Sequence, residues 1–226
     1  MKETAQFFLI PTPIGNLEDI TFRAVRLLGE VDLILAEDTR NTVNLLNFYK
    51  IKKTLKSYHS FNEHKIRKHV IDLLDQGLKI ALVSDAGTPG ISDPGFLIVK
   101  ACLEHNIEIE CLPGPTAFIP ALVKSGLPTD RFTFEGFLPH KKGRKKHLDS
   151  LITEKRTMVF YESPYRLLKT LRDFISNFGG DRQASVSREL TKKFEETING
   201  NLNSIVEQFE QKKIKGEFVI IVQGAG

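Results

Sequence analysis

The residues best suited to chemistry lie in four loops, each directly after an apolar segment that predicts a β-strand. The loops are Pro11–Asn16, Ser84–Gly95, Pro113–Ala117 and Tyr161–Arg166. The second holds three glycines, two prolines and two aspartates. Prolines, which restrict the backbone, and glycines, which free it, together favour a loop shaped to hold a ligand against its backbone. Loops past the carboxyl ends of strands are the usual binding sites of α/β folds.

The same loops lack the signatures of several common chemistries. No Gly-Lys-Ser/Thr follows the glycines, and no G-x-G-x-x-G follows the first strand, which argues against a Walker loop and a dinucleotide site. No G-x-S-x-G elbow predicts acyl transfer. Only two cysteines are present, and no His, Cys or Asp spacing suggests a metal. We therefore expect a site that binds and aligns a ligand without a metal.

Four residues could accept a proton, and a general base must lie within hydrogen-bond reach of its substrate. They are Glu37, Asp38, His59 and Glu162. For each of them, a structural or substrate-positioning role is a commoner explanation than that of the base. Arg40 could contact a phosphate or form a surface ion pair with its acidic neighbours.

A dense basic segment lies between Pro139 and His147. It contains Lys141, Lys142, Arg144, Lys145 and Lys146, in a chain of 226 residues whose net charge is only +4. A solvated helix start is the commoner explanation of such a run. Like charges this close repel one another, however, and gain from an anionic partner. We interpret the segment as a surface for nucleic-acid phosphates.

Hydrophobic periodicity predicts the elements that position these loops. In the first half, strands at 7–10, 33–36, 80–83 and 107–111 alternate with helices. One helix follows Thr21 and another carries Ile66 to Leu74. A third begins at Asp93-Pro94 and carries Phe96, Val99 and Leu103.

The second half predicts strands at 132–138, 158–161, 184–188 and 218–222, with helices between them. Thr116 and Ser163 are the expected caps of two of these helices. The pattern predicts an α/β protein of two αβα domains, residues 1–113 and 114–226, with the ligand site between them. The apolar run at 7–10 is too short to span a bilayer and lacks a cleavage pattern, so we expect a cytoplasmic protein without a membrane partner.

Motifs spread in order over nearly the whole chain resemble the tetrapyrrole methylase superfamily of S-adenosylmethionine-dependent methyltransferases. They are Ile10–Thr21, Ala36–Arg40, Val83–Gly95, Leu112–Ala117, Phe134–Pro139, Phe160–Pro164 and Gly216–Val219. The sequence Asp-Ala-Gly-Thr-Pro at 85–89, together with Glu-Asp-Thr-Arg at 37–40, is typical of the branch that acts on ribosomal RNA. The tetrapyrrole-modifying branch has a shorter Gly-Asp-Pro loop.

The resemblance implies a homodimer that binds S-adenosylmethionine in the cleft between the domains. It implies 2′-O-methylation of a cytidine ribose in 16S ribosomal RNA of the small subunit, near the decoding site; methylation of a tetrapyrrole is the alternative. The implied cofactor contacts are Ile14, Asp85, Ala86, Gly87, Thr116, Ala117, Tyr161 and Glu162. Many relatives carry a further C-terminal segment, so any RNA contacts that it makes are expected to come from elsewhere here.

The basic segment gives a first test. Replacing Lys141, Lys142, Arg144, Lys145 and Lys146 together should weaken binding to small ribosomal subunits and leave cofactor binding intact, because phosphate contacts supply much of nucleic-acid affinity. Filter binding of labelled subunits measures the first quantity and calorimetry the second. Unchanged affinity for the subunits would refute the assignment.

Overall fold

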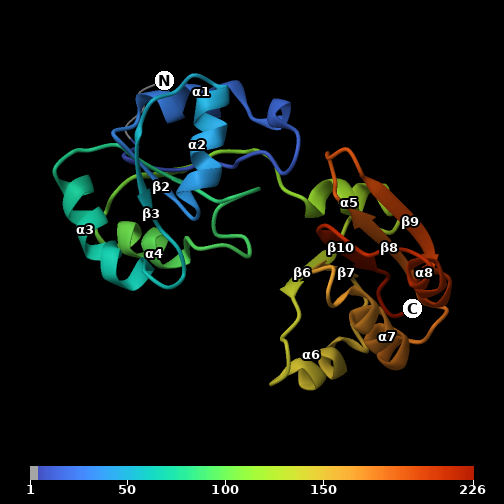
Figure 1. The fold of residues 1–226 in the computed structure, drawn as a ribbon. Coiled ribbons are helices and arrows are strands. Elements are labelled where there is room, and N and C mark those ends of the chain that lie inside the picture. Colours follow the sequence, from blue (N-terminus) through green and yellow to red (C-terminus); the bar gives the residue numbers. More distant parts are fainter. Residues whose placement is uncertain (1–4) are drawn as a thin grey trace. The chain divides into compact units, whose positions relative to one another are not determined.

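The computed structural model describes residues 5–226, and the chain separates into two compact units, Met1–Thr116 and Ala117–Gly226 (Figure 1). The boundary expected from the sequence lies in the same Pro-Gly-Pro-Thr segment, at 113–116. Each unit has its own sheet and its own hydrophobic core.

The first unit is built on a parallel sheet of five strands in the order β3-β2-β4-β1-β5. The strands β1, β2 and β4 are buried along their whole length, as continuous apolar strands are when helices cover both faces of a sheet. In chain order the strands are β1 (Phe7–Leu9), β2 (Leu33–Ala36), β3 (Thr54–Ser57), β4 (Ile80–Val83) and β5 (Ile109–Cys111).

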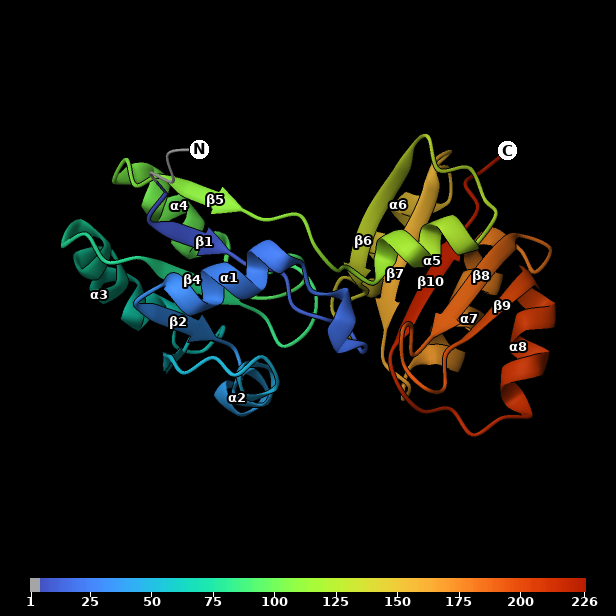
Figure 2. The ribbon, with the colours of Figure 1, turned by 90° about the horizontal axis from the view of Figure 1, so that it is seen from above.

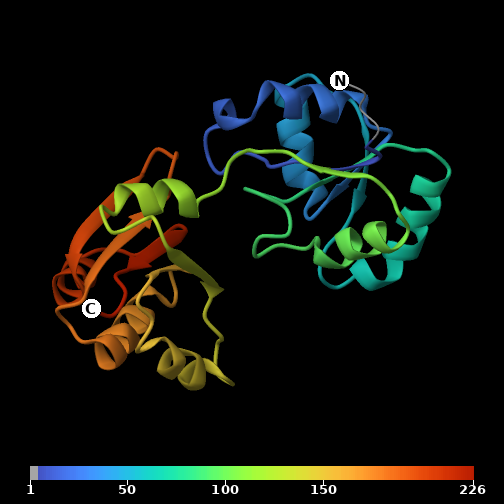
Figure 3. The ribbon, with the colours of Figure 1, turned by 180° about the vertical axis from the view of Figure 1, so that it is seen from behind.

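Helices cover both faces of this sheet because successive strand residues point to opposite sides. Phe8 and Ile34 pack with α1 (Phe22–Glu30) and α2 (Thr39–Phe48). Phe7 and Leu35 pack with α3 (Glu63–Asp75) and α4 (Phe96–Glu104), which lie side by side in Figure 3. A short 3-10 turn, η1 (Leu17–Asp19), precedes α1. The loops after β1 and β2 thus lead to one face and those after β3 and β4 to the other, an arrangement that favours ligand binding at the carboxyl edge.

The second unit has a mixed sheet in the order β6-β7-β10-β8-β9, in which only β6 and β7 pair in parallel. One face carries α5 (Phe118–Lys124), and the other carries α6 (Arg144–Leu151), α7 (Leu167–Phe178) and α8 (Leu202–Glu210) (Figure 2). The α/β fold of two αβα domains, predicted from the sequence, is confirmed. The strands are β6 (Phe132–Phe137), β7 (Thr157–Glu162), β8 (Gln183–Arg188), β9 (Glu196–Asn201) and β10 (Phe218–Val222).

The predicted start of α4 at Asp93-Pro94 is wrong. The helix begins at Phe96, after Gly95 at φ 154°. A Cβ on Gly95 would lie 3.1 Å from the backbone nitrogen of Gly90, so only glycine closes the loop at this point. The loop therefore ends where the backbones of Gly90 and Gly95 approach closely, and no side chain caps the helix.

The apolar residues named for α4 are only partly confirmed as core residues. Val99 packs against the core, but Phe96 and Leu103 are exposed, and Ile98, Ala101 and Cys102 are buried in their place. The helix is apolar on most of its surface, so periodicity alone did not select the correct stripe.

Two further helix caps differ from the prediction. The cap position of α5 is Ala117 rather than Thr116, and no side chain caps it. Ser163 belongs to a turn in which its carbonyl accepts a hydrogen bond from the Arg166 N–H, and α7 begins only at Leu167.

Close packing of Gly114 on Pro11 holds the loop after β5 against the loop after β1. A Cβ on Gly114 would lie 2.7 Å from the Pro11 Cβ. We expect Gly114→Ala to lower the free energy of unfolding by about 1–3 kcal/mol, because the two backbones must separate. Gly29→Ala, in open space on α1, is the matched control and should raise it by about 0.5–1 kcal/mol. Urea denaturation measures both, and equal stability of Gly114→Ala and the parent would contradict the close contact.

Candidate functional site at the carboxyl edge of the first sheet

The loops after β1, β4 and β5 are joined to one another by hydrogen bonds. Thr12 and Gly87 exchange two backbone hydrogen bonds, each of 2.9 Å. The Thr12 hydroxyl donates to the Ser84 carbonyl at 3.0 Å, and the Thr88 hydroxyl donates to the Pro115 carbonyl at 3.1 Å. These bonds satisfy polar groups where the sheet ladder stops, and they fix the three loops as one structure.

Gly87 lies where these three loops meet. A Cβ placed on it would be 3.7 Å from the Ile14 Cγ2 and 3.9 Å from the Pro115 carbonyl oxygen. The structure thus brings together Ile14, Gly87 and the residue before Thr116, three positions that are far apart in the sequence. Asp85 and Ala86 are exposed on the same loop.

A pocket of about 240 Å³ opens beside this junction. Of the individual site residues selected from the sequence, Asp85 lines it, and Thr12, Pro13 and Ser84 come from two of the selected loops. The sequence reasoning missed Asn41 and Asn44, whose spacing of three places them on one face of a helix; the helix itself, α2, was not predicted. The full lining is Thr12, Pro13, Leu17, Asn41, Thr42, Asn44, Leu45, Ser84 and Asp85.

The Asp85 carboxylate joins the end of β4 to the segment after β2 by hydrogen bonds. The Asp85 Oδ1 accepts from the Asp38 N–H at 3.0 Å, and its Oδ2 accepts from the Asn41 side-chain amide at 3.1 Å. Together with burial, the negative charge of Asp85 raises the pKa of the Glu37 carboxylate. We call these two interacting carboxylates the Glu37–Asp85 clasp. The Asp85 hydrogen bonds fix the start of α2 against the loop after β4.

Glu37 is half-buried at the centre of this edge. Ala36 pairs with Ser57 of β3 and with Val83 of β4, so the residues that follow these strands lie around Glu37. Burial raises the pKa of Glu37 above its usual 4.5, and the negative charge of Asp85 adds to the effect, while His59 opposes it. A carboxylate of raised pKa is a stronger proton acceptor than an ordinary one.

His59 lies at the same edge, directly after β3 and Tyr58. Its Nδ1 is buried and has no hydrogen-bond partner among the described residues. The imidazole ring packs edge-on against Phe61, with the ring centroids 5.9 Å apart. The structure therefore brings together two of the proton acceptors selected from the sequence, Glu37 and His59.

Asp38 is occupied by Arg40. The Asp38 carboxylate accepts two hydrogen bonds from the Arg40 Nε, at 3.0 and 3.1 Å, and one from its Nη2 at 2.5 Å. It also accepts from the Arg40 backbone N–H at the start of α2. These hydrogen bonds lower the pKa of Asp38 to about 2. Its carboxylate is therefore a weak proton acceptor, and Arg40 forms the ion pair that the sequence left open.

In the second unit, Tyr161 is half-buried, with ring centroids 5.2 Å from Phe134 and 5.6 Å from Phe137. Glu162 is buried and fully engaged. Its carboxylate accepts from the Ser163 N–H at 2.8 Å, the Thr170 hydroxyl at 2.6 Å and the Arg166 guanidinium at 3.2 Å. These contacts assign Glu162 a structural role at the start of α7.

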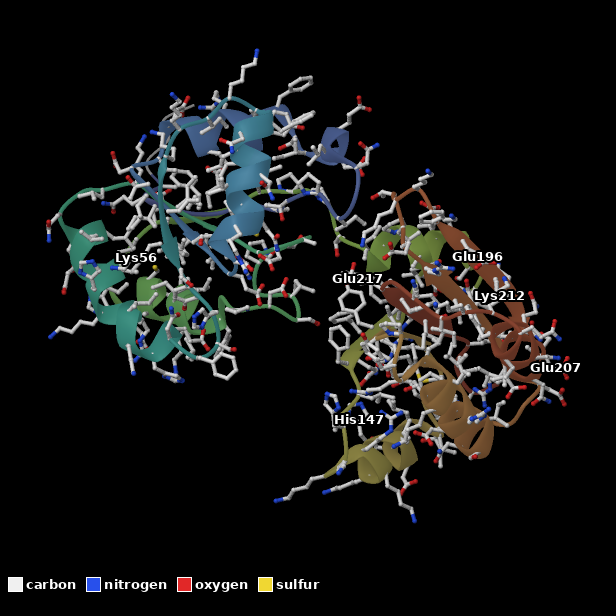
Figure 4. The ribbon with its side chains drawn as sticks, viewed as in Figure 1. Lys56, His147, Glu196, Glu207, Lys212 and Glu217 are labelled. Carbon is white, nitrogen blue, oxygen red and sulfur yellow. The ribbon has the colours of Figure 1, made fainter. Side chains whose placement is uncertain are left out.

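The basic segment divides into four exposed lysines and one buried arginine. Arg144 is only 6% exposed and donates to Asp173 at 2.8 Å and to Thr170 at 2.9 Å. Its expected role on the surface is therefore corrected: the guanidinium joins α6 to α7, so the RNA-binding test of the basic segment replaces the four lysines and retains Arg144. Lys141, Lys142, Lys145 and Lys146 are exposed, and Figure 4 shows nitrogen-tipped side chains extending from this end of α6. His147, labelled there, bonds Glu135 at 2.8 Å.

Within residues 5–226, no group of three or more His, Cys, Asp or Glu side chains is placed to hold a metal ion. None of the helices in this range is long and apolar enough to cross a membrane.

Comparison with known proteins defines the family. The profile described as Tetrapyrrole (Corrin/Porphyrin) Methylases matches residues 6–206, so the chain belongs to the tetrapyrrole methylase family. Within it, a Thermotoga maritima protein named "Ribosomal RNA small subunit methyltransferase I" is 49% identical over 219 residues, 97% of this chain and 98% of that protein. A protein of the same name from Escherichia coli O157:H7 is 48% identical over 224 residues, 97% of this chain and 78% of that protein.

Solved structures show the same fold at low identity. A cobalt precorrin-4 methyltransferase superposes with a TM-score of 0.70 at 17% identity, over 96% of this chain and 94% of its own. Uroporphyrin-III C-methyl transferase from Thermus thermophilus, complexed with S-adenyl homocysteine, gives 0.66 at 18% identity over 97% of both chains. These likenesses show the fold alone.

The clasp predicts a measurable titration. Asp85→Asn should lower the pKa of Glu37, because the neighbouring negative charge is removed while the Glu37 burial remains. The ¹³C shift of the Glu37 carboxyl carbon, followed against pH, reports this directly. Asp38 should keep its low pKa in the same spectra, since Arg40 is untouched. A Glu37 titration identical in both proteins would show that the two carboxylates do not interact.

Proposed function

We propose that the chain is an S-adenosylmethionine-dependent methyltransferase that 2′-O-methylates a cytidine ribose in 16S ribosomal RNA. The observation that carries the proposal is the 49% identity, over nearly the full length of both chains, to a relative named for small-subunit ribosomal RNA methylation. The loop of Asp85 to Pro89 and the adjoining Glu37 to Arg40 segment, brought together by the clasp, support it. The position of the modified cytidine, near the decoding site, rests on the family resemblance.

The residues at the carboxyl edge fit the cofactor. When bound, S-adenosylmethionine supplies a methyl group on a positively charged sulfur, which leaves as a neutral thioether. Gly87, at φ 86°, allows the loop to turn between Ile14 and Pro115, and the exposed Asp85 and Ala86 before it are accessible to a ligand. Each oxygen of exposed Asp85 has accepting capacity left for a ribose hydroxyl or an amine. Ile14, Asp85, Ala86, Gly87 and Thr116 form this part of the proposal.

From the second unit the proposal keeps Ala117 and Tyr161 as cofactor contacts. Glu162 is left out, because all of its hydrogen bonds are to neighbours of α7. Methyl transfer is an in-line displacement, so holding donor and acceptor aligned supplies much of the rate. The jointly fixed loops of the first unit are suited to that task.

For the proton of the ribose hydroxyl we assign Glu37 as the acceptor. Asp38 is neutralised by Arg40, which leaves Glu37 and His59 at this edge. Burial raises the pKa of the half-buried Glu37 carboxylate, which makes it a better proton acceptor than an ordinary carboxylate. In this assignment His59, which follows β3, orients the Glu37 carboxylate.

The RNA contacts of the proposal are phosphate contacts. Lys141, Lys142, Lys145 and Lys146 present exposed ammonium groups at the start of α6. The Arg40 side chain is 87% exposed and offers its remaining donors beside the Glu37–Asp85 clasp. We further propose a cytoplasmic homodimer, as the family resemblance implies.

A methyl-transfer assay with labelled cofactor tests the proposal. Small ribosomal subunits, naked 16S RNA and uroporphyrinogen are offered in parallel, and label is expected in RNA only. Because 2′-O-methylation blocks alkaline cleavage at the modified position, an alkali-resistant dinucleotide should carry the label. The Glu37→Gln variant should lose 10²–10⁴-fold in rate, the usual contribution of a general base.

The controls separate the parts of the proposal. Asp38→Asn should lose less than Glu37→Gln, since its carboxylate already serves Arg40. Label in uroporphyrinogen alone would establish the tetrapyrrole alternative, and alkali-labile product would place the methyl group on a base. A Glu37→Gln variant of parental rate would transfer the proton-accepting role to His59.

A further inference from the structure

Residues 50–69 carry a second concentration of positive charge, on the first unit. This stretch has seven lysines and arginines and one acidic residue, Glu63. The rest of the chain, outside residues 50–69, therefore has a net negative charge. The seven are Lys50, Lys52, Lys53, Lys56, Lys65, Arg67 and Lys68. The stretch includes β3, an edge strand of the sheet, and the first half of α3.

The fold leaves these charges accessible. Helix α3 buries Val70, Ile71 and Leu74, which keeps Lys65 and Lys68 exposed at a spacing of three on its outer side. Lys56 lies on β3, as labelled in Figure 4. Among the residues that the structure describes, none of the seven has a carboxylate within ion-pair distance. In the second unit, by contrast, Lys192 bonds both Glu189 and Glu217.

An aromatic ring stands at the end of this basic surface. The Phe61 side chain is 91% exposed and lies in the turn between β3 and α3. The turn is fixed, because Asn62 accepts the His59 N–H at 2.9 Å and donates its amide to the Ser57 carbonyl at 3.1 Å. The edge-on contact with His59 places the ring next to the carboxyl edge that holds Glu37.

We propose that this surface, named the β3–α3 face and made of Phe61 and the seven basic residues, binds an unpaired segment of the substrate RNA. Phe61 stacks on an exposed base, and the lysines contact the phosphates that follow. Aromatic rings among basic side chains are the common means of binding single strands, because every base has a face to stack on. Paired RNA offers no such face, so the partner is an unpaired segment.

The proposal rests on the proposed function and deepens it. It explains why a large apolar side chain is presented to solvent at the end of the very strand that supplies His59. It also gives the RNA a route across the first unit to the proposed acceptor site. This surface is separate from the lysines of α6, which belong to the other unit.

Fluorescence anisotropy of a short, unpaired, labelled RNA with the full chain tests the face. Phe61→Ala should weaken the affinity about tenfold, within the range for loss of one stacked base, and Phe61→Trp should retain it. Phe22→Ala removes another exposed ring, 98% accessible, from α1 on the opposite side of the sheet and should change nothing. Equal affinity of Phe61→Ala and the parent would overturn the proposal.

The salt dependence tests the lysines independently. Lys65→Gln with Lys68→Gln should reduce the slope of log K against log salt by about 0.7 for each lysine, the value for single strands. Lys213→Gln with Lys215→Gln, on exposed lysines outside both basic segments, is the control. An unchanged slope in the Lys65 and Lys68 variant would refute the phosphate contacts.

The methylation assay keeps the two proposals distinguishable. If ribosomal RNA is not methylated while Phe61→Ala still loses RNA affinity, the proposed reaction fails and the face stands. If ribosomal RNA is methylated and Phe61→Ala keeps both affinity and rate, the reaction stands and the face fails.

Discussion

Hydrogen bonds between the ends of neighbouring strands are the constraint on which this site depends. A parallel sheet stops abruptly at its carboxyl edge, and the polar groups there must find partners beyond the ladder. The Asp85 carboxylate, which accepts from the Asp38 N–H, supplies one between β2 and β4, and the Thr12–Gly87 pair supplies two between β1 and β4. The same bonds that complete the sheet therefore fix the loops in which the chemistry is proposed.

Within the first unit, acidic and basic side chains are separated. Glu37, Asp38 and Asp85 gather at the strand ends, whereas exposed lysines lie on the β3–α3 face. Such a separation suits a polyanionic substrate, because the lysines of the β3–α3 face hold phosphates away from the carboxylate that must accept a proton, and Arg40 beside that carboxylate is paired with Asp38. Asp85 of the clasp also lines the pocket. The hydrogen bonds that position its carboxylate against α2 therefore also shape the pocket wall.

The sequence predicted the buried parts of the fold better than its edges. Strands such as β4 and β10 are continuous apolar runs and were placed correctly, but β3 and β9 are polar edge strands and α2 is rich in asparagine, so no hydrophobic period marked them. The loops of the site were found from their glycine and proline content. Asn41 was missed with α2, and the burial of Arg144 depends on Asp173 and Thr170, which only the tertiary structure brings near.

The most direct test is a crystal structure of the protein with S-adenosylhomocysteine. The account predicts density for the ligand against Ile14, Gly87 and Pro115, with a ligand hydroxyl or amine within hydrogen-bond distance of the Asp85 carboxylate. Ligand density away from the carboxyl edge of the first sheet, with these residues untouched, would contradict the central claim that this edge is the methyl-transfer site.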